Sequence, residues 1–447
     1  MIISTSSSSL TSWSLQQWKK VFKSTNINHF NYSIELEKMV SKLRDSVTFL
    51  PLKDIRFTKT ATKGNTWFMS SMNNTYEDDE VEYVYFPSEA SKGRLLCIMG
   101  RDTHYGENNM YSLAWPESLP ACATLMGGLT FVSDTYYDYA NPFHALAAMA
   151  PFVGWYKRKG CEKPTRWVLY HWGELRTGMG SWIQNLMEAT FGGEVKVEGF
   201  EGGSGPFCFE KALVMRHNFG RMGKGKRVEV YDLLRCKARV YCNVTRPARV
   251  VVEVKKKLVP TIGLTLLMRN GARSFKNETA VVEIFQRECA RVEGCKLTVA
   301  HTKDLSFCNQ VSLMSSTDIL VSPHGAQLTN MFFMDRNSSV MEFFPKGWLE
   351  LAGGGQYVYL WTANLSGMRH EGAWRDQQGD KECPHPQQDH LQCFYFYKDG
   401  QVGHNETFFT EWSRRVINQV RIRKLDQFSK SLDTEFQQLN STVCACG

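Results

Sequence analysis

The feature that most constrains the fold is a regular alternation of strand-like and helix-like segments over residues 260–345. Four apolar runs predict strands, at residues 262–268, 295–300, 318–321 and 340–344. Three segments between them have helical periodicity, at residues 280–292, 306–316 and 327–334. Strands that alternate with helices form a parallel sheet, and such sheets bind ligands beyond the carboxyl ends of their strands.

A second, weaker alternation precedes this region. Apolar runs at 94–99 and 166–170 predict strands, and the second is followed by a loop at 173–180 and an amphipathic helix at 181–191. The longest uncharged stretch, 139–156, contains Asn141, His144 and two prolines and is shorter than a membrane span, so it is interpreted as a buried core segment. Both halves therefore predict an α/β class with Rossmann-like order.

The changes in composition suggest four parts along the 447 residues. Residues 1–60 are polar and weakly periodic, as in a partly ordered stem or leader. Residues 61–255 are expected to form an N-terminal, acceptor-side Rossmann-like domain. Residues 256–380 are expected to form the C-terminal, donor-binding domain, and residues 381–447 an extension that packs back on it.

Eight Asn-x-Ser/Thr sequons point to the secretory pathway, where chance would give roughly three. They are at Asn31, Asn73, Asn243, Asn277, Asn337, Asn364, Asn405 and Asn440. Thirteen cysteines suit the same compartment and, being odd in number, leave at least one thiol free or paired between chains. Residues 1–10 lack the apolar core of a signal peptide. Either the natural anchor is missing from this sequence, or the compartment assignment is wrong.

The net charge of +8 is mild and spread along the chain. A nucleic-acid-binding protein needs a basic stripe with interleaved aromatic residues, and none is seen. Mild basicity suits an anionic nucleotide or a negatively charged membrane surface instead.

The turn after the third strand of the 260–345 region carries the strongest chemical signal. The strand ends in Ser-Pro-His-Gly-Ala at 322–326 and opens directly into a helix. Gly325 permits a ligand to approach the backbone closely, and a helix start presents free N–H groups to phosphate. His324 can donate to a phosphate or a sugar hydroxyl, and Glu342 can accept from ribose hydroxyls. The alternative is an ordinary capped strand–helix turn.

Four pieces of this region resemble the signature of glycosyltransferase family 61. Gly325-Ala326-Gln327-Leu328-Thr329-Asn330 and Glu342-Phe343-Phe344-Pro345 are similar to its central motifs. Gln310 lies upstream of the Ser315–Asp318 stretch as the family's Gln does, and Arg269 and Arg273 resemble its Arg-x-x-x-Arg turn. The resemblance implies two Rossmann-like domains of the GT-B type, with parallel sheets facing across a cleft, and inversion at the anomeric carbon.

Residues 134–155 resemble a second family motif, Asn-x-x-His, at Asn141 and His144. Ala148 stands where many members have an acid, which puts the role of that acid in doubt. Among members, this stretch is most similar to plant N-glycan β-1,2-xylosyltransferases. Short stretches at 372–376 and 403–407 add to that similarity.

The resemblance implies the following roles. An inverting transferase needs one base for the acceptor hydroxyl and a cationic or amide-rich site for the departing diphosphate. We assign the base to His144, with Asp138 in reserve, although a buried structural histidine is the competing interpretation. We assign donor binding to Arg269, Arg273, His324, Gly325, Ala326, Asn330 and Glu342. Surface ion pairs are the alternative for the two arginines.

Acceptor binding is assigned to Asn141, Trp172 and Trp374, because flat aromatic faces stack on sugar rings; core packing is the alternative for both tryptophans. Asp134 and Asp138 are spaced too widely for an Asp-x-Asp motif, so no metal and no other cofactor is expected. Cys383 and Cys393 mimic a zinc knuckle with nearby histidines, but a disulfide between them is favoured. The terminal cysteines 444 and 446 are also expected in disulfides.

The sequence therefore predicts a Golgi-lumenal transferase that moves xylose from UDP-xylose, β-1,2, onto the core mannose of protein N-glycans. UDP-GlcNAc or UDP-arabinose with a protein or polysaccharide acceptor is the alternative within the family. Two other classes stay open: a glycan-binding relative without catalysis, and a cytosolic nucleotide-binding protein. The partners expected are the UDP-sugar donor and a glycan or glycoprotein, with no nucleic acid, and membrane association only through an anchor not seen in this sequence.

Overall fold

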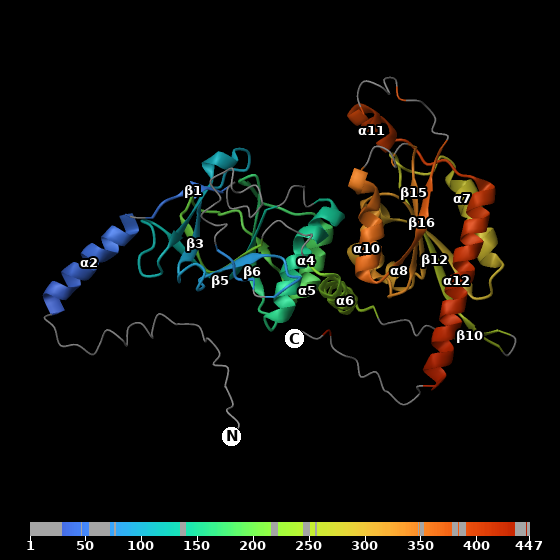
Figure 1. Ribbon diagram of the computed structural model, residues 1–447, viewed down its shortest axis with the longest axis horizontal. Helices are drawn as coiled ribbons and strands as arrows, with labels where there is room; N and C mark the ends of the chain where they lie inside the picture. The colour runs from blue at the N-terminus through green and yellow to red at the C-terminus, as the bar shows by residue number, and fades with distance from the viewer. Residues whose placement is uncertain are drawn as a thin grey trace.

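The structure is a computed structural model. It describes residues 29–45, 47–52, 72–75, 77–134, 140–215, 222–244, 251–254, 257–346, 348, 353–377, 383, 390–433 and 444. Within these ranges the chain forms two α/β halves, each built on its own sheet, and helix α6 lies between them (Figure 1). Of the expected stem, only helix α2 (His29–Asp45) and residues 47–52 belong to the described part.

The C-terminal half is built on the predicted parallel sheet, with strand order β13-β12-β14-β15-β16. Its strands are β12 (Ile262–Met268), β13 (Cys295–His301), β14 (Ile319–Pro323), β15 (Ser339–Phe344) and β16 (Arg369–Arg375). Its helices are α7 (Glu278–Ala290), η5 (Thr302–Asp304), α8 (Phe307–Ser315), η6 (Ala326–Phe333), η7 (Gly353–Tyr357), α10 (Val358–Ser366), α11 (His390–Lys398) and α12 (Glu406–Asp433). The segments predicted from the sequence are confirmed within a few residues, except that 326–333 is a 3₁₀ helix rather than an α-helix.

Helices cover both faces of this sheet, as in a doubly wound fold. Leu264 and Leu266 point to the face that packs against α7 and α12. Leu267, Leu320 and Val340 point to the opposite face, which packs against α8, η6 and α10. The sheet order reverses between β12 and β14, so the crevice at this topological switch point is where a ligand binds in such folds.

The N-terminal half has a mixed nine-stranded sheet, so the expectation of a parallel sheet here is wrong. Its central strands pair in parallel (β5 with β6 and with β9), whereas β3, β4 and β2 pair antiparallel. The strands are β1 (Leu50–Pro51), β2 (Tyr83–Phe86), β3 (Leu95–Met99), β4 (Met110–Ala114), β5 (Thr124–Asp134), β6 (Pro164–His171), β7 (Glu174–Arg176), β8 (Lys196–Val197) and β9 (Phe207–Met215). A separate hairpin, β10 (Val251–Val254) and β11 (Lys257–Pro260), follows.

The described helices of this half cover one face of its sheet. Helices α4 (Pro142–Arg158), α5 (Ser181–Phe191) and α6 (Lys224–Tyr241) share a core with Phe131, Trp167 and Leu213. The opposite face packs against non-helical segments that include Met72 and Phe200. This half is therefore α/β, but its described part is not a doubly wound Rossmann unit. The uncharged stretch at 139–156 is, as predicted, largely buried, and it forms most of α4.

The predicted loop at 173–180 contains the short strand β7, which the sequence analysis missed. Trp172 and Gly173 both have positive φ values, 54° and 86°, and form a two-residue turn that folds Glu174–Arg176 back onto β6. Positive φ at both turn positions is the geometry of a tight hairpin, which Asn-Gly or Gly-Gly normally signals. A tryptophan in the first position hides the signal.

Helix α6 fastens the two halves together through buried arginines. Arg235 donates to the carbonyls of Phe332 and Ser366, at 2.7 and 2.9 Å. Arg239 donates to Phe333 O at 2.7 Å and pairs with Asp335 at 2.8 Å. A buried guanidinium that satisfies several acceptors at once costs much to remove, because every partner would be left unpaired. The relative placement of the halves is thus built into α6.

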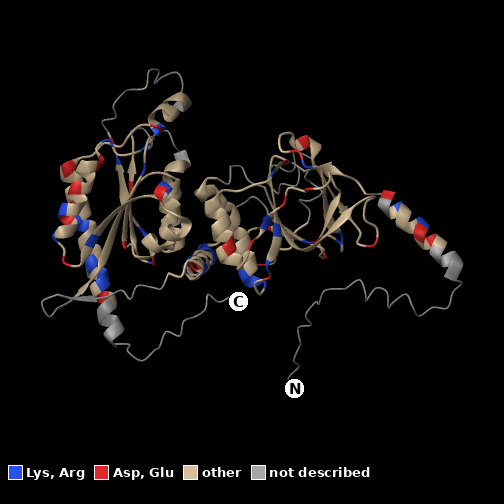
Figure 2. Cartoon of the chain, turned by 180° about the vertical axis from the view of Figure 1, so that it is seen from behind, with Lys and Arg blue, Asp and Glu red and all other residues tan. Residues whose placement is uncertain are grey.

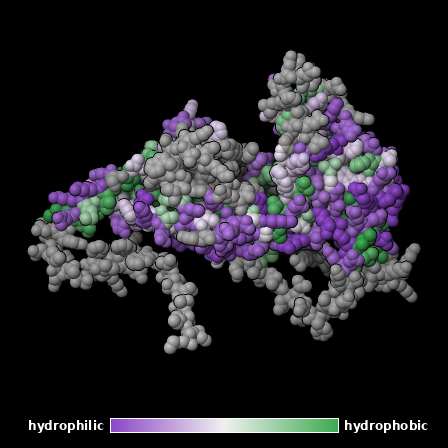
Figure 3. All heavy atoms as spheres, viewed as in Figure 1, coloured by the Kyte–Doolittle hydropathy of each residue, from purple (hydrophilic) through white to green (hydrophobic). Residues whose placement is uncertain are grey.

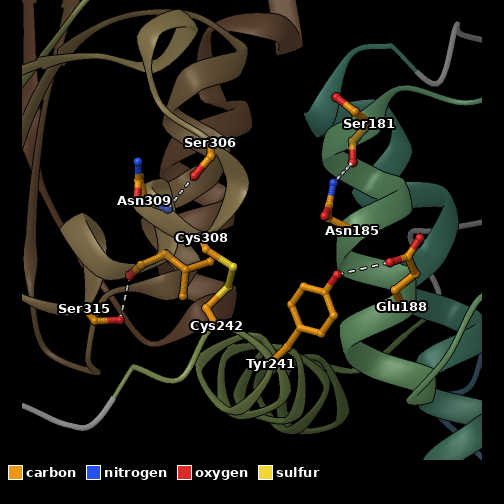
Figure 4. The surroundings of a disulfide bond; sticks show 10 residues. Ser181, Asn185, Glu188, Tyr241, Cys242, Ser306, Cys308, Asn309 and Ser315 are labelled. Carbon is orange, nitrogen blue, oxygen red and sulfur yellow. Dashed lines mark hydrogen bonds between the residues drawn. A yellow bond between two sulfur atoms is a disulfide. The ribbon is translucent and has the colours of Figure 1, made fainter.

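A disulfide closes the same junction. Cys242, just after α6, is bonded to Cys308 of α8, and Tyr241 beside it donates to Glu188 of α5 at 3.1 Å (Figure 4). The other disulfides within the described part are Cys97–Cys208, Cys236–Cys444, Cys289–Cys295 and Cys383–Cys393. The predicted Cys383–Cys393 pair and the pairing of Cys444 are confirmed. Cys122 is a free, exposed thiol.

Charged residues of both signs are frequent along α7 and α12, which lie on the side of the C-terminal half away from the N-terminal half (Figure 2). The described part of the face seen in Figure 3 is mostly hydrophilic over this half, with hydrophobic residues in small groups. No helix among the described residues is long and apolar enough to cross a bilayer. Six sequon asparagines are exposed: Asn73, Asn243, Asn277, Asn337, Asn364 and Asn405.

Candidate active site

The turn after β14 lies beside the end of β12, at the switch point of the C-terminal sheet. Arg269, the residue after β12, donates from Nη1 to the carbonyl oxygen of His324 at 3.1 Å. A Cβ atom on Gly325 would collide with this guanidinium and with the Gln327 side chain. The absence of a side chain at Gly325 therefore leaves room for the Arg269 guanidinium at the ligand end of the sheet.

Arg273 brings a second guanidinium to the same place. It has a left-handed backbone, with φ of 63°, and its N–H donates to Gly400 O at 3.0 Å. Its guanidinium lies over the Trp348 ring, 5.5 Å from the centroid. Burial, with the positive charge of Arg273 in second place, lowers the pKa of Arg269 to about 10. Burial also lowers the pKa of Arg273. Two half-buried guanidinium groups thus repel each other in the free protein.

These arginines have hydrogen-bonding capacity that the protein does not use. The buried Nε atoms of Arg269, Arg273 and Arg375 lack a hydrogen-bond partner among the described residues. Unpaired buried donors are rare because each costs free energy comparable to a lost hydrogen bond. A cluster of them with positive charge is suited to an anion whose oxygens complete the pairing.

Behind the arginines lies a chain of three polar side chains. His324 is 4% exposed, and its Nδ1 lies 2.6 Å from Oε1 of Glu342. The other oxygen of Glu342 lies 2.8 Å from Nε2 of His370 on β16. Burial alone would raise the pKa of Glu342, but its hydrogen bonds to His324 and His370 lower it overall. At neutral pH Glu342 is therefore a buried carboxylate held between two ring N–H groups.

Aromatic rings enclose His324. Phe344 stacks on its ring at 4.7 Å between centroids, Trp348 lies at 4.2 Å, and Tyr359 of α10 meets it edge-on at 5.2 Å. Burial lowers the pKa of His324, Glu342 opposes this, and the charges of Arg273 and Arg269 add to the lowering. The free protein therefore favours a neutral His324.

The first turn of α4 reaches this site from the N-terminal half. Phe143 packs against Tyr359 at 5.7 Å between centroids, and His144 is next to Phe143 in the chain. Burial lowers the pKa of His144, so its ring stays neutral at and below the usual histidine pKa. Asn141 is the N-cap of α4, and its side chain accepts from the N–H of Phe143. Asp138 lies outside the described residues.

Two predicted donor-binding residues lie at the junction of the halves. Asn330 is 2% exposed; its Oδ1 accepts from Trp182 of α5 at 3.0 Å, and its Nδ2 donates to Gln327 O. Asn330 thus connects the two halves in this structure. Ala326 begins η6 directly after Gly325, so it stays beside the arginines.

The two predicted acceptor tryptophans lie in different surroundings. Trp172 is 54% exposed in the turn between β6 and β7, at the carboxyl end of the parallel core of its sheet. Trp374 of β16 packs against Phe408 and Phe409, and its indole N–H donates to Gly403 O at 3.0 Å. The structure thus leaves Trp172 more than half exposed, with its ring beside that of His171, but places Trp374 in the packing against α12.

Three residues of the site were missed from the sequence. Tyr359 joins the two halves, Arg375 stacks over Phe344 at 4.9 Å, and His370 completes the chain to His324. Tyr359 and Arg375 carry no spacing signal, because α10 and β16 lie beyond the predicted strand–helix series. His370 carries none either, because its meeting with Glu342 depends on the register shift between β15 and β16.

Comparison with known proteins gives a family match that includes part of this site. Residues 129–341 match the family model of Glycosyltransferase 61. Three curated relatives carry the name Protein O-linked-mannose beta-1,4-N-acetylglucosaminyltransferase 2. The human and dog proteins are each 33% identical over 94 residues, which is 21% of this chain and 16% of theirs. The mouse protein is 32% identical over 102 residues, 22% of this chain and 17% of its own.

The matched stretch therefore spans only about a sixth of the length of these relatives. A match of this length does not carry the activity of these whole proteins over to this chain. The family match covers the end of the N-terminal sheet, the junction at α6 and the arginine–histidine site of the C-terminal half. Residues 129–341 are thus similar to the Glycosyltransferase 61 family, and a shorter stretch of the chain is similar to these named transferases.

Proposed function

We propose that this protein is an inverting glycosyltransferase that uses a UDP-sugar. The observation that carries the proposal is the pair Arg269 and Arg273, whose guanidinium groups are crowded and incompletely hydrogen-bonded at the switch point of a doubly wound sheet. A nucleotide diphosphate supplies the negative charge and oxygen acceptors that such a pair lacks. Gly325, Ala326 and His324 line the same place, and Asn330 positions the helix behind it.

Acceptor activation is assigned to the first turn of α4. His144 is next to Phe143, which packs on Tyr359, and Tyr359 packs on His324. This short chain of contacts supports a base on one side of the donor and cations on the other. We propose that His144, or Asp138 in reserve, removes the acceptor proton while the arginines stabilise the departing diphosphate. Asn141, Trp172 and Trp374 remain our proposals for acceptor contacts, with Trp172 favoured by its exposure.

The donor sugar we favour is xylose, transferred β-1,2 to the core mannose of an N-glycan, because of the resemblance around Asn141 and His144. The second candidate is UDP-GlcNAc, which the names of the mammalian relatives favour. UDP-arabinose is the third. No metal is proposed; among the described residues, no group of three or more His, Cys, Asp or Glu side chains is arranged so that it could hold a metal ion.

A donor screen by calorimetry tests this function. UDP, UDP-xylose, UDP-GlcNAc and UDP-arabinose are titrated into the protein, and turnover is followed with each sugar donor and a mannose-containing acceptor. We expect UDP itself to bind, since the diphosphate supplies most of the recognition, and UDP-xylose to be turned over. Binding without turnover of any donor would instead indicate a glycan-binding relative. Absence of UDP binding would reject the proposed site.

We further propose that the protein works in the Golgi lumen. The disulfides and the six exposed sequon asparagines are suited to an oxidising, glycosylating compartment. Treatment of the secreted or membrane-associated protein with an N-glycan endoglycosidase is expected to increase its gel mobility in proportion to the occupied sites. A protein whose mobility does not change and whose cysteines are reduced in cells would belong to the cytosol.

A further inference from the structure

The three polar side chains behind the arginines come from three neighbouring strands. His324 follows β14, Glu342 is on β15 and His370 is on β16. A register shift between Val340 and Glu342 lets the carboxylate meet His370, which is two positions earlier in the ladder. Glu342 is 1% exposed and both its oxygens are occupied by ring nitrogens. It therefore acts on a ligand through His324 rather than by direct contact.

This arrangement fixes the proton on one nitrogen of His324. An ionised carboxylate can only accept hydrogen bonds, so Nδ1 of His324, which lies against Glu342, carries a hydrogen. The other nitrogen, Nε2, has no partner among the described residues. It is a bare acceptor when His324 is neutral and a donor to an anion when His324 is protonated.

We propose that His324, Glu342 and His370 form a proton-coupled chain that takes up a proton when a nucleotide diphosphate binds. The proposal rests on the proposed function, since it requires the diphosphate at Arg269 and Arg273. The anion neutralises the two guanidinium groups that disfavour a positive charge on His324, while the Glu342 carboxylate behind the ring remains. No bond other than N–H forms: the proton comes from solvent and stays on Nε2 of His324. His370 is a positioning residue that holds the carboxylate.

The direction of the pH dependence follows from the groups around His324. Glu342 faces it from β15, with His370 and Arg375 behind on β16; Arg269 and Arg273 face it from the end of β12; Tyr359 faces it from α10. In the free protein, burial and the arginines lower the pKa of His324. A bound diphosphate raises it. The affinity for UDP therefore increases as pH falls through the pKa of the complex, by at most about tenfold per pH unit, and levels off below the pKa of the free protein.

The test is calorimetry of the full chain with UDP, between pH 6 and 8, in two buffers of different ionisation enthalpy. The difference between buffers gives the number of protons taken up. Because the terminal phosphate of UDP titrates near pH 6 itself, the wild type is compared with variants under the same conditions. Glu342→Gln is expected to lose the extra proton uptake and to bind UDP about tenfold more weakly near pH 6.5, the full effect of one coupled proton.

Two variants of His370 distinguish a positioning role, in which it donates a hydrogen bond to Glu342, from a role in packing alone. His370→Gln keeps a donor to Glu342 and is expected to behave like the wild type. His370→Leu removes the donor and is expected to lose the proton uptake. Glu288→Gln is the matched control, since Glu288 is also a buried carboxylate, 1% exposed and paired with Arg291 and Arg414 on α7 and α12, away from the site. It is expected to leave UDP binding and proton uptake unchanged.

Side-chain ¹⁵N spectra of the wild type give the same answer without a variant. A protonated Nε2 on His324 that appears only with UDP supports the proposal. The proposed proton uptake would be rejected if UDP bound with the same proton uptake in the wild type and in Glu342→Gln, and if His324 stayed unprotonated in the complex. The proposed transferase function would not be affected by that result. Failure of UDP to bind at all would overturn both.

Discussion

Replacing Arg273 with methionine is expected to weaken UDP binding about 10- to 100-fold without destabilising the free protein. A charge-assisted hydrogen bond to an anion contributes about 1.5–3 kcal/mol, and each 1.4 kcal/mol is a factor of ten in affinity. Among the described residues the guanidinium of Arg273 makes no hydrogen bond, and it lies against Arg269 and the Trp348 ring. The substitution therefore removes a like-charge repulsion from the free protein and costs it one stacking contact, so its stability should not fall.

Substitution of the two arginines should have different effects on the thermal unfolding midpoint of the protein. Arg269→Met also loses the hydrogen bond to His324 O, so its unfolding midpoint is expected at or slightly below that of the wild type. Arg273→Met is expected at or above it. Binding sites that hold like charges close together are often destabilising for the free protein, so removing one charge can raise stability while it lowers ligand affinity. Thermal unfolding with and without UDP measures both effects, because a ligand that binds only the folded state raises the midpoint.

An exposed arginine supplies the control. Arg415→Met on α12 removes the same charge from the surface and is expected to change neither UDP affinity nor the midpoint appreciably. If Arg273→Met bound UDP as tightly as the wild type and unfolded at a lower temperature, the arginine would be a structural residue. The assignment of the donor site would then fail.

The C-terminal half could be predicted closely because its signals are local. Three of its strands, β12, β14 and β15, are mostly apolar and almost entirely buried, since both faces of the centre of a parallel sheet are covered. The N-terminal half could not be predicted to the same extent. Its sheet is mixed and has one face packed against irregular segments, so the pairing of β9 with β2, β3 and β5 depends on contacts far apart in the sequence.

The residues of the candidate site could also be predicted only where the signal is local in the sequence. Arg269, Gly325 and His324 follow apolar strands directly, so their meeting at the sheet edge could be expected from strand order. The burial of Glu342 between two histidines could not, because it depends on the register shift between β15 and β16. Likewise, Asn330 carries the expected motif, but its amide bonds to Trp182 across the junction, which no local pattern reveals.

His144→Ala is expected to lower kcat by about 10²- to 10⁴-fold, the usual contribution of a positioned general base, while UDP affinity stays within a factor of two. The residue lies on α4, across Phe143 and Tyr359 from the donor side, so its loss leaves Arg269 and Arg273 untouched. Because burial lowers its pKa, the wild-type rate should remain high as pH falls and decline only below the ordinary histidine range. In the variant this acid limb should disappear.

His301→Ala is the matched control, since His301 is also a half-buried histidine and its ring lies beside Glu278 of α7. It is expected to leave both kcat and the pH profile unchanged. Near-normal turnover of His144→Ala would reject His144 as the base. In that case Asp138→Asn becomes decisive: loss of turnover in that variant, with UDP still bound, would assign the proton to the Asp138 carboxylate. The two single variants therefore distinguish the candidates, because only the true base combines intact donor binding with a lost chemical step.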